Sequence, residues 1–163
     1  VYPVVGLRHV IIEAACSELE GKTPTLSGPP TLRKVLGYLM PESNFRQWLF
    51  DGDSLGDGES LIGMFDAIQT YGLPFMRDNA SLEKIDKLMN NYDYIFRHER
   101  ARKWPIAKLL LGKRDEAMHV MEDYISLLES EDRIEAVEDY KRYLELIVEK
   151  ADWIESYTYN TKI

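Results

Sequence analysis

The C-terminal third of the chain carries apolar residues at helical spacing. In two stretches, 115–130 and 132–157, they recur every three or four residues, as on the buried face of an amphipathic helix. The longer stripe consists of Ile134, Val137, Tyr140, Leu144, Ile147, Val148, Ala151 and Ile154. Burying these side chains would contribute on the order of 10–20 kcal/mol before the entropy of ordering is subtracted, so this helix must dock. The short break at 129–132 predicts two antiparallel neighbours.

The pattern near the N-terminus is mixed. Residues 1–5 predict a short strand, and 8–20 predict a helix that ends at Gly21. The segments 31–40 and 45–50 are rich in β-formers and flank a turn-forming tetrapeptide, which predicts an antiparallel hairpin. A strand needs a neighbour for its backbone groups. The first strand therefore either joins this hairpin in one small sheet or pairs with a segment further upstream.

Two further segments predict helices in the middle of the chain. The first runs from about residue 59 to 71, after a turn-rich loop, and Gly72 is expected to end it. Its buried stripe is expected at Leu61, Ile62, Met64, Phe65 and Ile68. Ser81 can cap a second helix that continues to about residue 90. A third helix, 101–111, is followed by Gly112, a typical C-terminal stop.

These patterns predict a mainly α fold (α+β), with a small antiparallel sheet on the N-terminal side followed by an antiparallel helical bundle. The 163 residues suit one domain. Within it we expect a strand–helix–hairpin region at 1–58 and a helical region at 59–163. Alternatively, the chain is the C-terminal part of a longer protein, in which an upstream segment completes the sheet.

Composition and charge narrow the expected location and partners. No apolar stretch is long enough to span a bilayer, no signal peptide is visible, and the single cysteine, Cys16, suits a reducing compartment. We therefore expect a cytoplasmic protein without a membrane partner. The net charge is −8, and residues 115–163 hold fourteen acids against five bases, a balance of −9. An acidic surface disfavours nucleic acid and favours a basic protein.

One basic segment supports an alternative function. Residues 97–114 hold seven Lys and Arg against one acid, a balance of +6. Aromatic residues lie among the basic patch, a mixture that can stack bases and hold phosphates. The patch consists of Arg97, Arg100, Arg102 and Lys103. Nucleic-acid binding through 97–114 is therefore an alternative. Because acidic helices follow directly, we expect these charges to be neutralised within the chain instead.

Residue types that could carry catalysis or bind a metal are few. Asp51, Asp53 and Asp57 partly match a calcium loop, but Leu55 and Ile62 occupy positions where that pattern needs oxygen ligands. The histidines lack the spacing of a zinc site, and Cys16 falls on an apolar helix face, where burial raises a thiol pKa. We therefore predict no catalytic residue, no metal and no cofactor. An enzyme that uses acidic residues, with His119 as a further candidate, stays an alternative.

Two resemblances add to this interpretation. Residues 107–121 (AKLLLGKRDEAMHVM) are similar to the turn of one tetratricopeptide unit, with Ala117 as the small residue between the helices. The segments YPVVGLRHVIIEAACSEL, GYLMPESNFRQWLF, YGLPFMRDNASLE and KLLLGKRDEA, in this order, resemble an uncharacterised bacterial family. That resemblance covers residues 1–120 and implies a preceding α+β portion that ends in the strand at 1–5. It carries no catalytic residue over to this chain.

The favoured function is a protein-binding module. Aromatic residues are enriched at binding hot spots, and four are expected to be partly exposed. These candidate partner-binding residues are Trp48, Trp153, Tyr157 and Tyr159. Small acidic bacterial proteins often neutralise secreted toxins, so by analogy we expect an immunity-type inhibitor of a basic toxin. Pairing of the last helix with a second copy would give a homo-oligomer.

Overall fold

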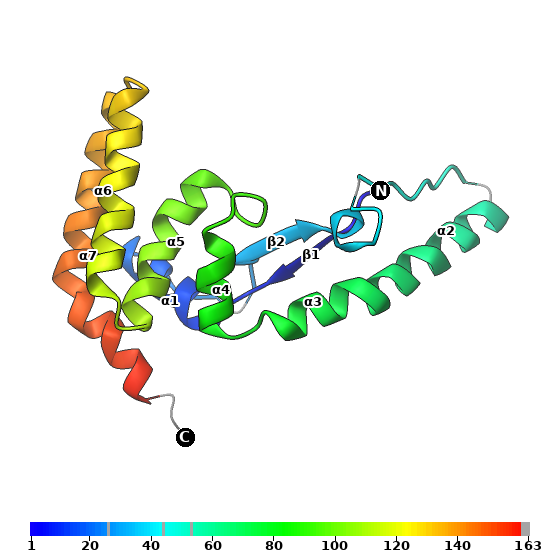
Figure 1. Ribbon diagram of the computed structural model, residues 1–163, viewed down its shortest axis with the longest axis horizontal. Helices are drawn as coiled ribbons and strands as arrows, with labels where there is room; N and C mark the ends of the chain where they lie inside the picture. Colours follow the sequence, from blue (N-terminus) through cyan, green and yellow to red (C-terminus); the bar gives the residue numbers. More distant parts are fainter. Residues whose placement is uncertain (26, 44, 53, 161–163) are drawn as a thin grey trace.

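The computed structural model describes residues 1–25, 27–43, 45–52 and 54–160, with side chains throughout except at 54 and 158–160. The fold is mainly helical with a small antiparallel sheet on the N-terminal side, as predicted (Figure 1). Its elements are β1 (Val4–Leu7), α1 (Val10–Leu19), β2 (Leu32–Val35), a 3₁₀ turn η1 (Leu36–Leu39), α2 (Ser54–Ala67), a π turn η2 (Ile68–Gly72), α3 (Leu73–Asp78), α4 (Leu82–Met89), α5 (Arg97–Leu110), α6 (Arg114–Ser130) and α7 (Ile134–Asn160).

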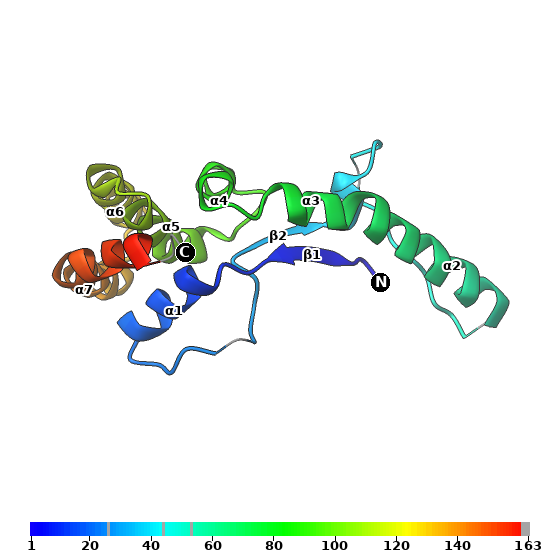
Figure 2. The ribbon, with the colours of Figure 1, turned by 90° about the horizontal axis from the view of Figure 1, so that it is seen from below.

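Helices α1, α5, α6 and α7 form a bundle, in which α5, α6 and α7 run up and down beside one another (Figure 1). Helix α1 lies against α5 and α7 (Figure 2). Met121 and Leu128 of α6 and Ile147 and Ile154 of α7 are almost fully buried in its core. The predicted docking of the last helix on its predecessor is confirmed. Ile134 and Val148, however, belong to the predicted stripe and are exposed.

Local signals set the ends of several elements as predicted. Gly21 and Gly112 have φ of 67° and 70°, a left-handed conformation that ends α1 and α5 at little cost only for glycine. The Ser81 hydroxyl accepts a hydrogen bond from the backbone N–H of Lys84 and so caps α4. These stops fix the lengths of the helices that pack in and beside the bundle.

The small sheet differs from the predicted hairpin. β1 pairs with β2 in antiparallel register, with Val5 opposite Lys34, and residues 36–39 form the 3₁₀ turn instead of continuing a strand. Residues 45–50 are not a strand. Instead, the backbone N–H of Trp48 donates to the carbonyl of Val1 at 2.8 Å. The hairpin prediction is wrong because β2 pairs across α1 with the first strand, which a local turn signal cannot reveal.

The sheet is tethered to the bundle. The backbone N–H of Arg33 in β2 donates to the carbonyl of Tyr94 at 2.8 Å, just before α5 begins. The guanidinium of Arg33 also pairs with the Glu99 carboxylate of α5 at 2.9 Å. Because β2 also contacts α4, the sheet is held where the chain enters the bundle.

Beyond the sheet, residues 45–52 and 54–78 form an extension that we call the arm. Helix α2, the π turn and α3 make one continuous helical rod that extends away from the bundle (Figure 1). The rod begins earlier than predicted, at Ser54, and Gly72 does not end it. A Cβ at Gly72 would lie only 2.9 Å from a methyl carbon of Val5, so glycine here permits the rod to approach β1.

No helix in the described part of the chain is long and apolar enough to span a membrane.

Candidate functional site

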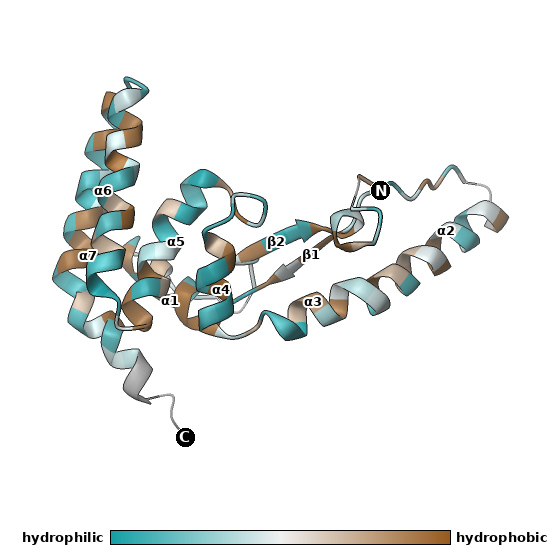
Figure 3. Cartoon of the chain, viewed as in Figure 1, coloured by the Kyte–Doolittle hydropathy of each residue, from teal (hydrophilic) through white to brown (hydrophobic). Residues whose placement is uncertain are grey.

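The arm exposes an apolar helix face. Leu55, Ile62 and Phe65 of α2 are 75%, 63% and 53% exposed. They lie seven and three residues apart, so they share one side of the helix and form what we call the exposed stripe. Figure 3 shows hydrophobic positions continuing along α2, at a distance from the bundle. Further exposed apolar side chains of the arm are Phe45, Leu49, Phe50, Leu61 and Leu73.

This exposure corrects the prediction that the face of 59–71 is buried. Met64 and Ile68 do pack against a small second core, but Leu61, Ile62 and Phe65 face solvent. The second core has four buried members, Val5, Leu36, Trp48 and Ala67. It covers one side of α2 only, because the bundle lies at the other end of the molecule. The sequence pattern identified an apolar face correctly but placed it inside.

Trp48 packs in the second core against α2 and is not an exposed partner-binding residue. Its side chain is only 4% exposed, which contradicts the expected exposure. A Cβ at Gly63 of α2 would lie 3.7 Å from the indole Nε1, so the ring sits beneath the helix. This N–H is buried and finds no hydrogen-bond partner within the described residues. An unpaired donor of this kind costs about 1–3 kcal/mol.

The two other described aromatic candidates lie on the bundle. Trp153 and Tyr157 of α7 are half-buried and pack against the main core. Their rings meet edge to face with centroids 5.1 Å apart, and the Lys150 ammonium lies 5.5 Å from the Trp153 ring. The side chain of Tyr159 lies outside the described residues. The structure therefore does not bring Trp48 together with this pair.

The basic patch is engaged within the chain as expected, but only Arg97 pairs with an acid that follows α5. Arg97 pairs with Glu131 at 2.6 Å, and these contacts raise its pKa. Arg102 pairs with Glu20 of α1. The Arg100 guanidinium instead donates to the carbonyl of Met89 at 2.7 Å, beside the Trp104 ring. Lys103 is buried against α1. The four residues therefore hold α5 to its neighbours.

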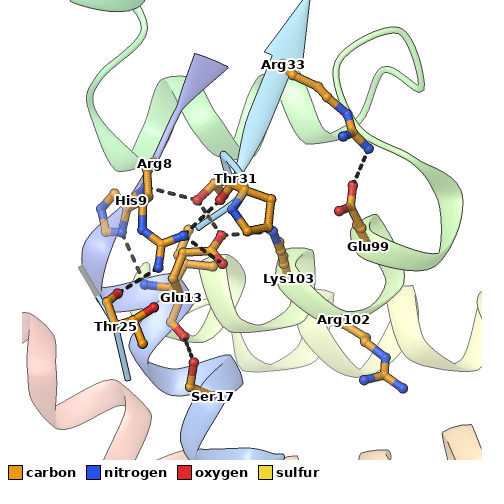
Figure 4. Close-up of polar contacts among 12 residues, drawn as sticks. Arg8, His9, Glu13, Ser17, Thr25, Thr31, Arg33, Glu99, Arg102 and Lys103 are labelled. Atoms are coloured by element: carbon orange, nitrogen blue, oxygen red, sulfur yellow. Dashed lines mark hydrogen bonds and ion pairs between the residues drawn. The ribbon is translucent and has the colours of Figure 1, made fainter. Parts of the chain in front are cut away.

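Lys103 belongs to a buried polar cluster around Glu13 (Figure 4). The Lys103 ammonium lies 2.9 Å from the Glu13 carboxylate. The Thr31 hydroxyl donates a hydrogen bond to the same carboxylate at 2.6 Å. The same hydroxyl accepts the backbone N–H of His9 at 2.9 Å. Burial lowers the pKa of His9, whose Nδ1 accepts from Ile12 and caps α1. This Glu13 cluster joins α1, the start of β2 and α5.

A cavity of about 430 Å³ opens beside the Glu13 cluster. It lies between the loop after α1 and the charged side chains of α1 and α5. The guanidinium of Arg8 lies in its wall and donates to the carbonyls of Thr25 and Pro29, both at 2.8 Å. Glu20 on its wall is paired with Lys22 and Arg102. The charged side chains on the cavity wall are thus engaged with one another and with the loop, and these contacts tie the loop to the helices.

A second buried polar cluster surrounds Asp86 of α4. The Trp104 indole donates to this carboxylate at 2.7 Å, and Lys108 and Lys113 pair with it at 3.0 and 2.9 Å. Burial alone would raise the pKa of Asp86, but the hydrogen bonds outweigh it and hold the pKa below its usual value. Neither Glu13 nor Asp86 was singled out in the sequence. The sequence signal that could have identified these two clusters is an acidic residue on a helix face that is predicted to be buried.

The residues considered for catalysis lie in two places, Asp51 and Asp57 at the start of α2 and His119 on α6. The Asp57 carboxylate accepts the backbone N–H of Asp51 at 3.0 Å and closes the loop before α2, whereas His119 lies exposed on α6 beside Asp123. Asp53 lies outside the described residues. Burial raises the pKa of the Cys16 thiol to about 12, which disfavours a nucleophilic thiolate. Within the described ranges, no three potential metal-ligating side chains gather.

Comparisons with known proteins give no relative to transfer a function from. No protein-family model matches the chain, and neither the curated proteins nor the solved structures contain a match. The resemblances to an uncharacterised bacterial family and to a tetratricopeptide unit therefore stay predictions.

Proposed function

We propose that this protein binds another protein through the exposed stripe of the arm. The observation that supports this proposal is the exposure of three large apolar side chains, Leu55, Ile62 and Phe65, on one helix face. Apolar residues scattered singly on a surface need no explanation, but many exposed apolar side chains gathered on one element, as on this arm, are typical of an interaction surface. Covering it with a partner would remove this area from water.

The arm also has the shape of a binding element. Its rod extends away from the bundle (Figure 2), so a partner can approach it without meeting the other helices. The second core beneath it, with Trp48 against Gly63, supports the rod from the opposite side. The exposed stripe is thus presented on a helix whose own packing does not depend on that stripe.

The alternative functions have weaker support. Nucleic-acid binding through 97–114 would require Arg97, Arg102 and Lys103 to leave their carboxylate partners. Acid-based catalysis would need acidic residues beside a substrate-sized site, whereas Asp57 is engaged by the backbone of its own loop. Binding of a protein at the exposed stripe requires neither the breaking of these ion pairs nor the release of Asp57 from its loop.

The more specific form of the proposal is an immunity-type inhibitor of a basic toxin. Its support is the balance of −9 over 115–163, from fourteen acids and five bases. Acids such as Glu122, Glu138 and Glu145 lie exposed on the outer faces of α6 and α7. A negative exterior accelerates the approach of a positively charged protein.

Site-specific photocrosslinking tests the interface. A photoreactive side chain at position 62 or 65 in the full chain should give a discrete adduct with one and the same protein in the native cell. Val148 offers a matched control, because it is an exposed apolar residue of α7 away from the arm. Adducts that are absent from 62 and 65, or equally strong from 148, contradict the proposal.

A competition experiment adds a second criterion. Excess unlabelled wild-type chain should suppress the adduct, whereas excess Ile62→Glu chain should not. Because Ile62 is exposed, this substitution should leave the thermal unfolding midpoint close to that of the wild type. Equal competition by both chains would show that the stripe does not bind the captured protein.

A further inference from the structure

The helical rod of the arm carries acidic residues but few cations, since the arm's two basic residues, Arg46 and Arg77, lie before and near the end of the rod. Residues 54–76 contain Asp57, Glu59 and Asp66 but no Lys, Arg or His. Asp57 is engaged by its own loop, while Glu59 and Asp66 are exposed. Within the described residues, neither of these two forms a hydrogen bond or an ion pair. The arm therefore combines apolar exposure with negative charge that the chain itself leaves uncompensated.

These acids lie alongside the exposed stripe. Glu59 follows Leu55 by four residues and Asp66 follows Ile62 by four, which places each acid next to an apolar member on the same side of α2. The order along this side is apolar, acidic, apolar, acidic. A surface that docks here meets both kinds of group at once.

Several acids of the bundle, in contrast, are paired with cations of the same chain. Glu131 pairs with Arg97, Glu129 with Lys141, and Asp152 with Arg114. These pairs join different helices or the turns between them, so cations from neighbouring elements are available. No basic side chain of the described chain serves Glu59 or Asp66 in this way. A cation for them has to come from outside.

From this juxtaposition we infer that the arm binds a basic amphipathic helix of another protein, with an apolar side flanked by Lys or Arg. The inference rests on the proposed function and specifies its partner. Apolar residues of that helix pack on Leu55, Ile62 and Phe65, as in helix-to-helix recognition. Its cations lie beside Glu59 and Asp66, where they favour association and set the orientation.

A second copy of this chain fits the surface less well. If two α2 helices pack antiparallel about the midpoint between Ile62 and Gly63, Glu59 of one copy lies opposite Asp66 of the other. If they pack parallel, each acid meets its own equivalent. Both arrangements place like charges side by side, which is unfavourable in an interface. An anionic lipid surface is repelled by the same two carboxylates.

Two labelled synthetic helices provide the probe. Both carry the same leucine side, and their polar side consists of lysine in one and glutamate in the other. Fluorescence anisotropy with the full chain should show about tenfold or greater preference for the lysine helix at low salt. The preference should shrink as salt is raised, because exposed charges are screened.

Matched variants locate the effect on the arm. The double variant Glu59→Lys/Asp66→Lys should bind the lysine helix about tenfold more weakly and the glutamate helix more tightly. The control Glu138→Lys/Glu145→Lys changes the net charge equally on the exposed face of α7 and should retain the wild-type preference. Ile62→Ser/Phe65→Ser should weaken binding of both helices, because the apolar contact is lost.

The outcomes separate this inference from the proposed function. Equal binding of the two helices, no binding of either, or an equal effect of the α7 control overturns the basic partner. The proposed function then still depends on the crosslinks from positions 62 and 65 alone. Self-association in sedimentation that disappears in Ile62→Ser/Phe65→Ser would assign the stripe to a second copy and also overturn the inference.

Discussion

The bundle and the arm use similar apolar helix patterns with opposite results. In the bundle, α7 presents its stripe to three other helices, and members such as Ile147 and Ile154 lose all contact with water. In the arm, α2 has one small core on one side and solvent on the other. An amphipathic pattern thus predicts that a face will be covered, but not that the same chain covers it. The difference distinguishes an apolar face that the fold covers from one that it leaves exposed.

The largest difference between the two regions should appear on truncating an isoleucine in each. Ile147→Ala leaves a cavity in the bundle and should lower the free energy of unfolding by about 2–5 kcal/mol. Ile62→Ala should change it by less than about 0.5 kcal/mol, because that side chain is already exposed. Chemical denaturation of both variants measures the contrast. A comparable loss in Ile62→Ala would mean that the exposed stripe is covered in solution.

Asp86→Ala leaves Lys108 without its buried partner, a change that typically costs about 3–5 kcal/mol, and we expect a loss of about 3 kcal/mol, near the middle of the range for Ile147→Ala. We expect the lower end of the range because Lys108 still pairs with Glu116. Asp86→Asn keeps an acceptor for Trp104 and should lose less. This cluster lies at the bundle, so arm variants should not share its pH dependence.

The sign of that pH dependence follows from the lowered pKa of Asp86. A carboxyl whose folded-state pKa is depressed stabilises the fold above its ordinary pKa. The contribution is lost as the pH falls through the depressed folded value. The stability gap between wild type and Asp86→Ala should therefore be constant near neutral pH and narrow below about pH 4. A gap that does not change on acidification would exclude this electrostatic contribution.

The smallest expected effect concerns the rigidity of the arm. Gly58 lies within α2, where an added Cβ meets nothing within 4 Å. Gly58→Ala should stabilise this helix by about 1 kcal/mol through propensity alone. Hydrogen exchange of the α2 amides should slow accordingly. In contrast, Gly112→Ala should destabilise, because its φ of 70° is strained for alanine. Unchanged exchange in Gly58→Ala would indicate that α2 opens only with the whole molecule.

Much of the fold was predictable where the physics is local. The stop at Gly112, the cap at Ser81 and the pairing of the last two helices depend on residues close together in sequence. The pairing of the first strand with the segment 31–40 was predicted only as one of two alternatives, because no local signal selects it. β1 pairs with β2 across the whole of α1, while the residues after β2 only resembled the start of a hairpin.

The candidate site was less predictable than the fold. Sequence alone located the apolar face at Ile62 and Phe65 but not its exposure, since exposure depends on where the bundle lies. It likewise expected Trp48 to be exposed, although the ring is buried under α2. Aromatic residue type indicates binding potential, whereas accessibility is decided by long-range packing that a single sequence does not contain. The division at residues 58 and 59 stays a prediction.

The tethering of the sheet has a consequence for how this architecture can vary. The chain leaves the bundle side at β2 and returns at α4, and these two elements touch. The segment between them, residues 36–81, therefore leaves and re-enters the fold at neighbouring points. A segment of this kind can be lengthened, shortened or replaced while the path of the chain through the bundle stays the same. The bundle and the arm are therefore free to diverge at different rates.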